Sequence, residues 1–252
     1  MIYTKQTYKI KAKKPYLFIG SKIRGMLGYA LKDEVCINPS FKCDGCFAKG
    51  ECVFYDMYEK QNTQHNYRLD FKLYDDEYKF SLLLFGKLQS KSKSIHKAML
   101  NALKNYKKIK YKEKTKTLKI KKKRPKLIKL IFQTPLRMKK NNRFILKERE
   151  VDIKDILLSI YKIDLELKKE PYKPLNFNEN LKTISKKFYY KELTRKSNKQ
   201  NTKMNVGGLM GEMLVSGIDE ESYKLLKLGE VLGCGKSRVF GLGKFKLEKI
   251  DV

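Results

Sequence analysis

The sequence of 252 residues contains no tryptophan, only two histidines and no long apolar run. A membrane-spanning helix needs about 20 consecutive apolar residues, so the sequence argues against a transmembrane protein. Residues Met1 to Lys14 carry lysine every few positions and lack the apolar core of a secretory signal, so we expect a cytoplasmic protein. Without tryptophan, any stacking on nucleic-acid bases has to come from tyrosine and phenylalanine.

Acidic residues are also scarce, since 27 Asp and Glu stand against 58 Lys and Arg and leave a formal charge of +31. Fifty of the basic residues are lysine, as in a protein from an AT-rich coding sequence. Codon bias does not explain why acids fail to balance the excess. The charge therefore predicts a polyanionic partner, either nucleic acid or an anionic membrane. Hydrophobic residues, at 41%, are numerous enough for a packed core.

The first half of the chain shows a strand, a helix, a hairpin and a second helix. Tyr8 to Ala12 alternates apolar and polar residues, and Ser21 to Lys32 repeats apolar residues at helical spacing, with Ser21 as the expected N-cap. Lys104 to Lys129 holds fourteen basic residues and one acid. The remaining elements expected here are strands Arg68–Tyr74 and Tyr78–Phe85, helix Ser94–Tyr106 and edge strand Thr117–Lys121.

The second half repeats the same order of elements. The expected elements are strand Lys126–Thr134, helix Ile153–Lys168, strands Lys182–Leu193 and Lys203–Val215, helix Glu220–Leu228 and strand Lys244–Ile250. This order predicts an α+β protein made of two tandem ferredoxin-like domains, βαββαβ units of the kind found in RNA-recognition modules. We place the N-terminal domain at 1–125 and the C-terminal domain at 126–252, with the boundary near Arg124-Pro125.

Four of the five cysteines fall within one loop-like segment, 36–52, of the N-terminal domain. Cys36, Cys43, Cys46 and Cys52 have the spacing Cys-x6-Cys-x2-Cys-x5-Cys. The central Cys-x2-Cys resembles half of a zinc knuckle, and Gly45 allows the tight turn that directs two thiolates at one ion. Four thiolates fill a tetrahedral site, so we expect a structural zinc. The alternative is a group of unrelated thiols or a reactive pair.

A glycine-rich loop near the C-terminus combines glycines with basic side chains. It runs from Leu232 to Gly243 and surrounds Lys236, Ser237 and Arg238 with glycines. Glycines let backbone N–H groups converge on an anion, and the basic side chains add charge. Gly229 lies one residue too far from Gly235 for a Walker A loop, and no strand precedes it. The glycines concerned are Gly233, Gly235, Gly241 and Gly243.

The segment Gly233 to Phe245 resembles the signature loop of the RAMP superfamily of CRISPR-associated proteins, and within it the endoribonuclease family that processes precursor CRISPR RNA. Ile23 to Gly28, with the following cysteines and Tyr55, resembles the first helix and insertion of one branch. Phe132 to Arg137 resembles the opening strand of the family's C-terminal domain. Arg195–Gln200 resembles the family's basic hairpin, and Met204–Gly211 resembles the strand that follows it. A glycine-rich loop that some members of the family have at the end of the first domain is missing here, and lysines around Lys119 to Lys123 stand in its place.

The resemblance implies two ferredoxin-like domains and cleavage of CRISPR repeat RNA without a catalytic metal. In the family the 2′-hydroxyl attacks the adjacent phosphate and leaves a cyclic phosphate. Where a histidine is used, it lies in the first helix or between that helix and the second strand, which selects His65 here. Tyr29 and Lys22 are the expected partners, for the hydroxyl and for the phosphorane, and Arg24 can replace Lys22. The alternative for His65 is a solvated loop residue.

The expected RNA contacts lie on two loops and the opening strand of the C-terminal domain. They are the basic residues Arg137, Arg195, Lys196, Lys199, Lys236 and Arg238, with Gly233, Gly235, Gly241 and Gly243. Each lysine taken singly is more commonly a solvated surface charge. Expected partners are CRISPR repeat RNA and subunits of a CRISPR effector complex, and no membrane is expected as a partner. We expect the protein to be a monomer or a homodimer.

Two other functions remain open from the sequence. One is a non-catalytic RNA-binding subunit of a CRISPR effector complex, built on the same fold. The other is a zinc-bearing RNA-binding protein with a different purpose. The products formed from repeat RNA in the presence of EDTA distinguish these alternatives from an endoribonuclease.

Overall fold

The computed structural model describes residues 1–120, 125–197 and 202–250, with the backbone alone at 196, 197, 202 and 203. The chain divides into two compact units, Met1–Thr117 and Leu118–Val252. Both combine helices with antiparallel sheets, so the α+β fold expected from the sequence is confirmed. Arg124, on one side of the expected boundary at Arg124-Pro125, and most of the lysine tract Lys119 to Lys123 lie outside the described residues.

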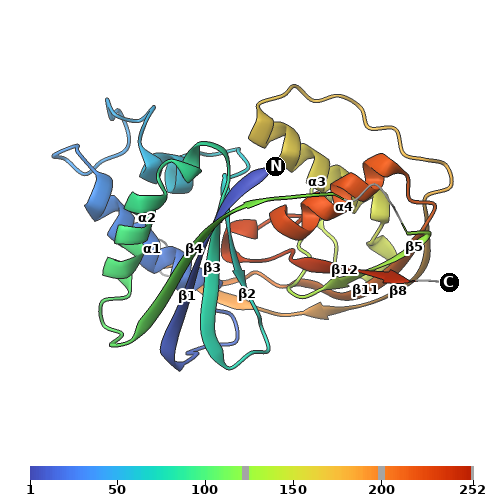
Figure 1. The fold of residues 1–252 in the computed structure, drawn as a ribbon, viewed down its shortest axis with the longest axis horizontal. Coiled ribbons are helices and arrows are strands. Elements are labelled where there is room, and N and C mark those ends of the chain that lie inside the picture. Colours follow the sequence, from blue (N-terminus) through green and yellow to red (C-terminus); the bar gives the residue numbers. More distant parts are fainter. Residues whose placement is uncertain (121–124, 198–201, 251–252) are drawn as a thin grey trace. The chain divides into compact units, whose positions relative to one another are not determined.

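The first unit is a four-stranded antiparallel sheet with two helices on one of its faces (Figure 1). Its elements are β1 (Ile2–Lys13), α1 (Gly20–Val35), β2 (Tyr67–Phe71), β3 (Glu77–Leu84), α2 (Ser92–Ala102) and β4 (Ile109–Thr117). The strand order is β2-β3-β1-β4. Alternation along β1 buries Thr4, Gln6, Tyr8 and Ile10 on the helix side, because successive side chains of a strand point to opposite faces.

The second unit has the same strand and helix order in its main sheet, which is arranged β12-β5-β11-β8. The elements of this sheet and its helices are β5 (Leu127–Phe132), α3 (Ile153–Lys168), β8 (Lys182–Lys191), β11 (Gly208–Ser216), α4 (Glu220–Leu232) and β12 (Phe245–Ile250). Two small ribbons are added, β6 (Lys139–Lys140) with β7 (Arg143–Phe144), and β9 (Thr194–Ser197) with β10 (Thr202–Asn205).

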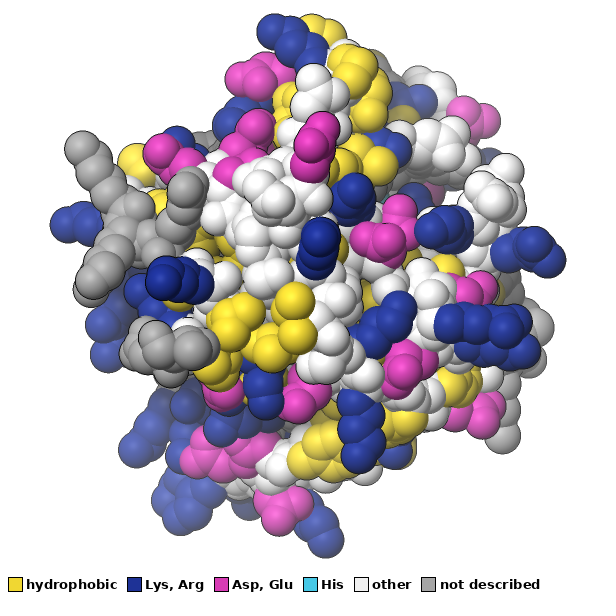
Figure 2. Space-filling model, turned by 90° about the vertical axis from the view of Figure 1, so that its right-hand side faces the viewer, with side chains coloured by type: hydrophobic (Ala, Val, Ile, Leu, Met, Phe, Trp, Pro, Cys, Tyr) yellow, Lys and Arg dark blue, Asp and Glu magenta, His cyan; other side chains and the backbone are white. Residues whose placement is uncertain are grey.

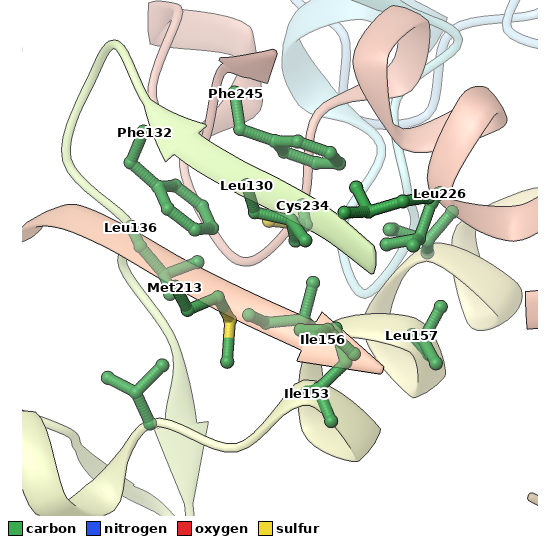
Figure 3. Packing of buried hydrophobic residues seen from close by; sticks show 14 of the residues in the cluster. Leu130, Phe132, Leu136, Ile153, Ile156, Leu157, Met213, Leu226, Cys234 and Phe245 are labelled. Atoms are coloured by element: carbon green, nitrogen blue, oxygen red, sulfur yellow. The ribbon is translucent and has the colours of Figure 1, made fainter. Parts of the chain in front are cut away.

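The core of the second unit forms where α3 and α4 pack on the sheet (Figure 3). Phe132 from β5 and Phe245 from β12 have ring centroids 5.5 Å apart. The aliphatic side chains of Ile156 and Leu226 approach them from the two helices. Cys234, at the start of the glycine-rich loop, is fully buried in this core, so the loop is anchored to the sheet.

Four local differences from the sequence prediction stand out. The N-cap of α1 is Ile19 with no side-chain hydrogen bond, so Ser21 lies inside the helix and caps nothing. The edge strand is β4 and ends at Thr117, whereas it was expected at Thr117–Lys121, of which Lys121 lies outside the described residues. The second strand pair carries an extra ribbon, β9–β10, at its tip. The β6–β7 hairpin was not expected, although its turn residues Asn141 and Asn142 adopt the left-handed backbone that asparagine tolerates.

Within the described residues, no helix combines the length and apolar character required to cross a lipid bilayer.

Candidate functional site

His65 lies in the segment between the cysteine-containing loop and β2, and it is half-buried. Its Nδ1 lies 3.1 Å from the carbonyl oxygen of Asp56. A carbonyl oxygen can only accept, so Nδ1 carries the proton in this contact and donates it. In the neutral ring Nε2 then holds the lone pair. This tautomer is the one required for an imidazole that takes a proton at Nε2.

Arg24 of α1 reaches the same region through Tyr67 of β2. Its Nε donates to the Tyr67 hydroxyl at 2.9 Å and its Nη2 to the Met57 carbonyl at 3.4 Å. The Tyr67 ring lies 6.0 Å from the His65 ring. Burial raises the pKa of the Tyr67 hydroxyl, so it remains a neutral phenol at ordinary pH. The structure therefore brings His65 and Arg24 to one buried tyrosine.

Tyr58, in the short π-helical turn Tyr55–Glu59, packs the end of the cysteine-containing segment against α1. The Arg24 guanidinium stacks 4.4 Å from the ring centroid of Tyr58, whose hydroxyl donates to the Arg24 carbonyl at 2.8 Å. The same ring covers Gly28, where an added Cβ would lie 2.7 Å from a ring carbon. This close approach explains why glycine stands at position 28 of α1.

Lys22 and Tyr29 occupy a different side of α1 from Arg24. They are seven residues apart and share one helix face, whereas Arg24 lies about half a turn away from Lys22. Both are exposed, Tyr29 with 64% of its surface accessible. The Lys22 ammonium lies 5.5 Å from the Tyr16 ring centroid. Of the four residues predicted for catalysis, the described contacts thus join His65 and Arg24, and leave Lys22 and Tyr29 on the helix surface.

The other histidine, His96 of α2, lies in a separate polar cluster beneath the helices. Its ring stacks on Tyr111 of β4 with centroids 3.6 Å apart, and its Nδ1 lies 3.0 Å from the Tyr8 hydroxyl. Glu113 accepts from Tyr111 and from Gln6, both at 2.8 Å. Burial lowers the pKa of His96, and the Glu113 carboxylate partly offsets this. The cluster joins α2 to the edge strand.

The four clustered cysteines line one shared cavity at the end of α1. Gly45, with a φ of 64°, makes the expected tight turn, and the Cys46 amide donates to the Cys43 carbonyl. Partial burial raises the pKa of the Cys43 thiol, and the thiols of Cys52 and Cys36 add to this. Among the residues that the structure describes, no three His, Cys, Asp or Glu side chains stand close enough to hold an ion. The donor set suits zinc in kind, but the thiols do not form a closed coordination sphere.

The glycine-rich loop is held by hydrogen bonds within the fold. The amides of Cys234, Gly235, Lys236 and Gly243 donate to the Gly243 carbonyl, the Ser159 hydroxyl, the Arg137 carbonyl and the Pro135 carbonyl. An added Cβ at Gly243 would lie 1.8 Å from the Cys234 carbonyl oxygen, and the φ of Gly243 is 70°. Gly235 and Gly243 thus allow close packing of the loop, and these four amides are not directed at an anion.

The two basic side chains of this loop differ in burial. Lys236 is exposed, as expected for a phosphate contact. Arg238 is buried, with 3% of its surface accessible, and donates from Nη1 to the carbonyl of Leu232 at 2.9 Å. The expectation of a phosphate-binding Arg238 is therefore corrected. Ser237 has a left-handed backbone conformation and precedes a short 3₁₀ turn. The side chain of the next residue, Arg238, caps the C-terminal end of α4.

Arg137 and Arg195 each stack on an aromatic ring beside the loop. The Arg137 guanidinium lies 3.8 Å from the Phe144 ring centroid, and that of Arg195 lies 4.8 Å from the ring of Phe240. Burial lowers the pKa of Arg137, which nevertheless stays fully charged near neutrality. Lys199 and the side chain of Lys196 lie outside the described residues. Three of the expected basic contacts, Arg137, Arg195 and Lys236, thus lie on or beside the glycine-rich loop.

The β6–β7 hairpin adds residues to this surface that the sequence analysis missed. Lys139 lies 5.1 Å from the Phe144 ring, and Lys140 and Arg143 are exposed beside it. The Asn-Asn pair between basic residues was the available turn signal in the sequence. In the space-filling view, Lys and Arg side chains are spread over the face shown, with Asp and Glu between them (Figure 2). The surface beside the loop combines fixed cations with aromatic rings.

Two protein-family models match parts of the chain. A family model described as CRISPR-associated endoribonuclease Cas6 matches residues 130–245. A second family model, described as an N-terminal domain, matches residues 4–142. No curated protein sequence matches the chain.

Solved structures resemble the chain over nearly its whole length. A Cas6 product complex has a TM-score of 0.63 at 13% identity and covers 98% of this chain and 99% of its own. Thermus thermophilus Cas6 has a TM-score of 0.57 at 12% identity and covers 98% of both. A RAMP protein described as binding different RNA substrates has a TM-score of 0.54 at 11% identity and covers 99% and 100%. At these identities the likeness concerns the fold.

Proposed function

We propose that the chain belongs to the Cas6 family of CRISPR-associated endoribonucleases, and that it cuts CRISPR repeat RNA within precursor transcripts and so gives mature CRISPR RNA. The Cas6 family model that matches residues 130–245 supports this. The observation that carries the proposal is the surface beside the glycine-rich loop, where Arg137 and Arg195 stack on aromatic rings and Lys236 is exposed. Fixed cations of this kind suit phosphates at the base of an RNA stem. The net charge of +31 supplies long-range attraction for RNA.

We propose that cleavage needs no metal and uses the RNA's own 2′-hydroxyl. The hydroxyl proton passes to Nε2 of His65, the 2′-oxygen bonds to phosphorus, and the bond from phosphorus to the 5′-oxygen breaks. The leaving 5′-oxygen takes a proton from water, and a 2′,3′-cyclic phosphate remains. The contact of His65 Nδ1 with the Asp56 carbonyl supports this role, because it leaves the lone pair on Nε2.

Residues of α1 take two different parts in this proposal. Arg24 holds Tyr67 and the Met57 carbonyl, so it positions the segment that carries His65. Lys22 and Tyr29, exposed on another face of the helix, contact the RNA, with the ammonium against the phosphorane and the phenol beside the 2′-hydroxyl. Arg24 is thus a positioning residue and does not replace Lys22.

We also propose that each compact unit is a ferredoxin-like domain. In both, the strands and helices of the main sheet follow the order βαββαβ. In both, the first and third strands are central and the fourth and second lie at the edges. Other CRISPR proteins are proposed partners, because the chain also resembles 28% of a chain in a structure described as a Cas6-RT-Cas1–Cas2 complex. In the cell we place the protein in the cytoplasm, as a monomer or homodimer.

The test of this function is the product formed from repeat RNA in EDTA. We expect one cut within the repeat, a 2′,3′-cyclic phosphate on the upstream fragment, and no cut when the nucleotide before the scissile bond lacks its 2′-hydroxyl. Binding of the repeat without any cleavage would contradict the endoribonuclease and support a non-catalytic RAMP subunit. Cleavage that requires added metal would contradict the proposed mechanism.

We propose that Cys36, Cys43, Cys46 and Cys52 bind one structural zinc ion. Their common cavity and the left-handed turn at Gly45 support this, and four thiolates leave no open position for chemistry. Elemental analysis of protein never exposed to chelators should find one zinc per chain. A variant with serine at Cys43 and Cys46 should lose it, whereas Cys234→Ser should retain it. Protein without zinc in the unmodified form would contradict the proposal.

A further inference from the structure

The edge strand β4 carries a regular row of lysines on one face. Lys110, Lys112, Lys114 and Lys116 alternate with Tyr111, Glu113 and Thr115, and all seven are exposed. Alternate residues of a strand point to the same face and are about 6.8 Å apart along it. The four ammonium groups therefore form a line of evenly spaced charges, roughly 20 Å long between its first and last members.

The opposite face of β4 holds the strand in place. Tyr111 stacks on His96, and Glu113 accepts hydrogen bonds from Tyr111 and Gln6. Glu113 is the sole acid of the strand, and it is turned away from the lysines. The lysines thus occupy one face of β4, and the contacts that hold the strand in the sheet occupy the other. The fold therefore does not depend on the lysine charges.

Neighbouring lysines on β1 are neutralised, whereas those on β4 are not. Lys5 and Lys9 lie opposite Lys114 and Lys110 in the sheet register. Lys5 pairs with Asp70 at 3.1 Å, and Lys9 pairs with Glu77. Among the residues that the structure describes, no carboxylate pairs with Lys110, Lys112, Lys114 or Lys116. The row is therefore available to an anion from outside the fold.

Protection of a sheet edge accounts for part of this pattern. Lysines on an edge strand discourage pairing with another chain. That purpose does not require four lysines in register on one face with the only acid on the other. A line of fixed charges also matches an extended polyanion better than a compact anion. On the lysine face β4 has no aromatic residue, and of the β1 residues opposite the four lysines only the half-buried Tyr3, across from Lys116, is aromatic. The row therefore offers charge along its whole length and little surface on which bases could stack.

We propose that the lysine row of β4 binds the backbone of single-stranded RNA, independently of base sequence. In the setting of the proposed function, this strand is the part of the transcript outside the folded repeat, and only that identification rests on the proposed function. The row supplies phosphate contacts additional to those beside the glycine-rich loop. It lies in the first unit, in the chain's own lysine-rich segment.

The test compares binding of a single-stranded oligouridine over a range of salt concentrations. The variant K110Q/K112Q/K114Q/K116Q should bind more weakly, and its slope of log K against log salt should be smaller by about 2.8, since each phosphate contact in a single strand contributes roughly 0.7. The oligouridine has no repeat and no cut is scored. A protein that fails to cleave repeat RNA can therefore still pass this test.

A matched control removes the same charge elsewhere. Lys154, Lys162, Lys169 and Lys173 are exposed on and just after α3, and their replacement by glutamine should leave the slope nearly unchanged. Equal losses in both variants would overturn the proposal, because net charge alone would then explain them. An unchanged slope in the β4 variant would also overturn it, as would an equal loss on a perfectly paired RNA duplex. Circular dichroism should show both variants folded, because the β4 lysines make no contact that the strand needs and the control lysines are exposed, with Lys162 lying 5.6 Å from the Tyr172 ring centroid.

Discussion

Individual residues decide the chemistry proposed for this protein, and His65 is the first of them. His65→Ala should lower the single-turnover cleavage rate by ~10²–10⁴-fold, the usual contribution of general acid–base catalysis, with little change in RNA affinity. His96→Phe serves as the control, since it removes the other imidazole and retains a flat ring against Tyr111. A rate for His65→Ala within a few-fold of the parent, measured on end-labelled repeat RNA, would exclude His65 as the base.

Two glycines of α1 offer a matched comparison of the same substitution. Gly28→Ala should reduce the free energy of unfolding by roughly 1–3 kcal/mol, because its Cβ would meet the Tyr58 ring at 2.7 Å. Gly25→Ala should increase it by up to about 1 kcal/mol, because no atom lies within 4 Å and alanine favours a helix. Urea denaturation measures both. Equal effects of the two substitutions would show that Tyr58 does not rest on Gly28.

At the scale of elements, the contact between α2 and β4 should respond to pH. Burial lowers the pKa of His96 below its ordinary value of 6.5, although Glu113 opposes the shift. The folded state then binds fewer protons than the unfolded state, so stability is full above pH 6.5 and falls as the pH decreases through this value. The thermal midpoint should drop between pH 7.5 and 5, and less in His96→Phe. An equal drop in that variant would assign the effect to other groups.

Elements with an apolar face were predictable, and β4 shows where prediction failed. Helix α3 has the bounds that its apolar repeat predicts, Ile153 to Lys168. Strand β4 has almost no apolar residues, so its hydrophobic pattern was uninformative and the strand was expected further along the chain. Its position is determined by pairing with β1 and by the stacking of Tyr111 on His96, which join residues far apart in the sequence.

Across the whole molecule, location distinguishes charges that the sequence makes look alike. Arg195→Ala and Arg238→Ala each remove one of the 58 basic residues. Arg195→Ala should reduce the salt slope for repeat RNA by about 1, with stability little changed. Arg238→Ala should instead lower stability by roughly 1–3 kcal/mol, because it leaves the buried Leu232 carbonyl without its donor. A stable Arg238→Ala protein with a reduced salt slope would restore the original expectation for this residue.

The sequence allowed the candidate site to be found only in outline. The segments that surround it could be named, because glycines, cysteines and basic residues mark them directly. The direction of each side chain could not, because it depends on backbone conformation and distant partners. Arg238 turns inward after a left-handed Ser237, and the amide of Gly235 is taken by Ser159 of α3. Neither contact could be predicted from the residues that are nearby in the sequence.

The covering of Gly28 by Tyr58 also has a consequence for inheritance. The glycine is needed because a ring from the cysteine-containing segment rests on it, and the ring fits because the glycine has no side chain. The helix and that segment therefore cannot change independently at these positions. A descendant that loses Tyr58 loses the requirement for glycine, and one that gains a larger residue at position 28 has to move or replace the tyrosine. Positions 28 and 58 are therefore expected to covary among related sequences.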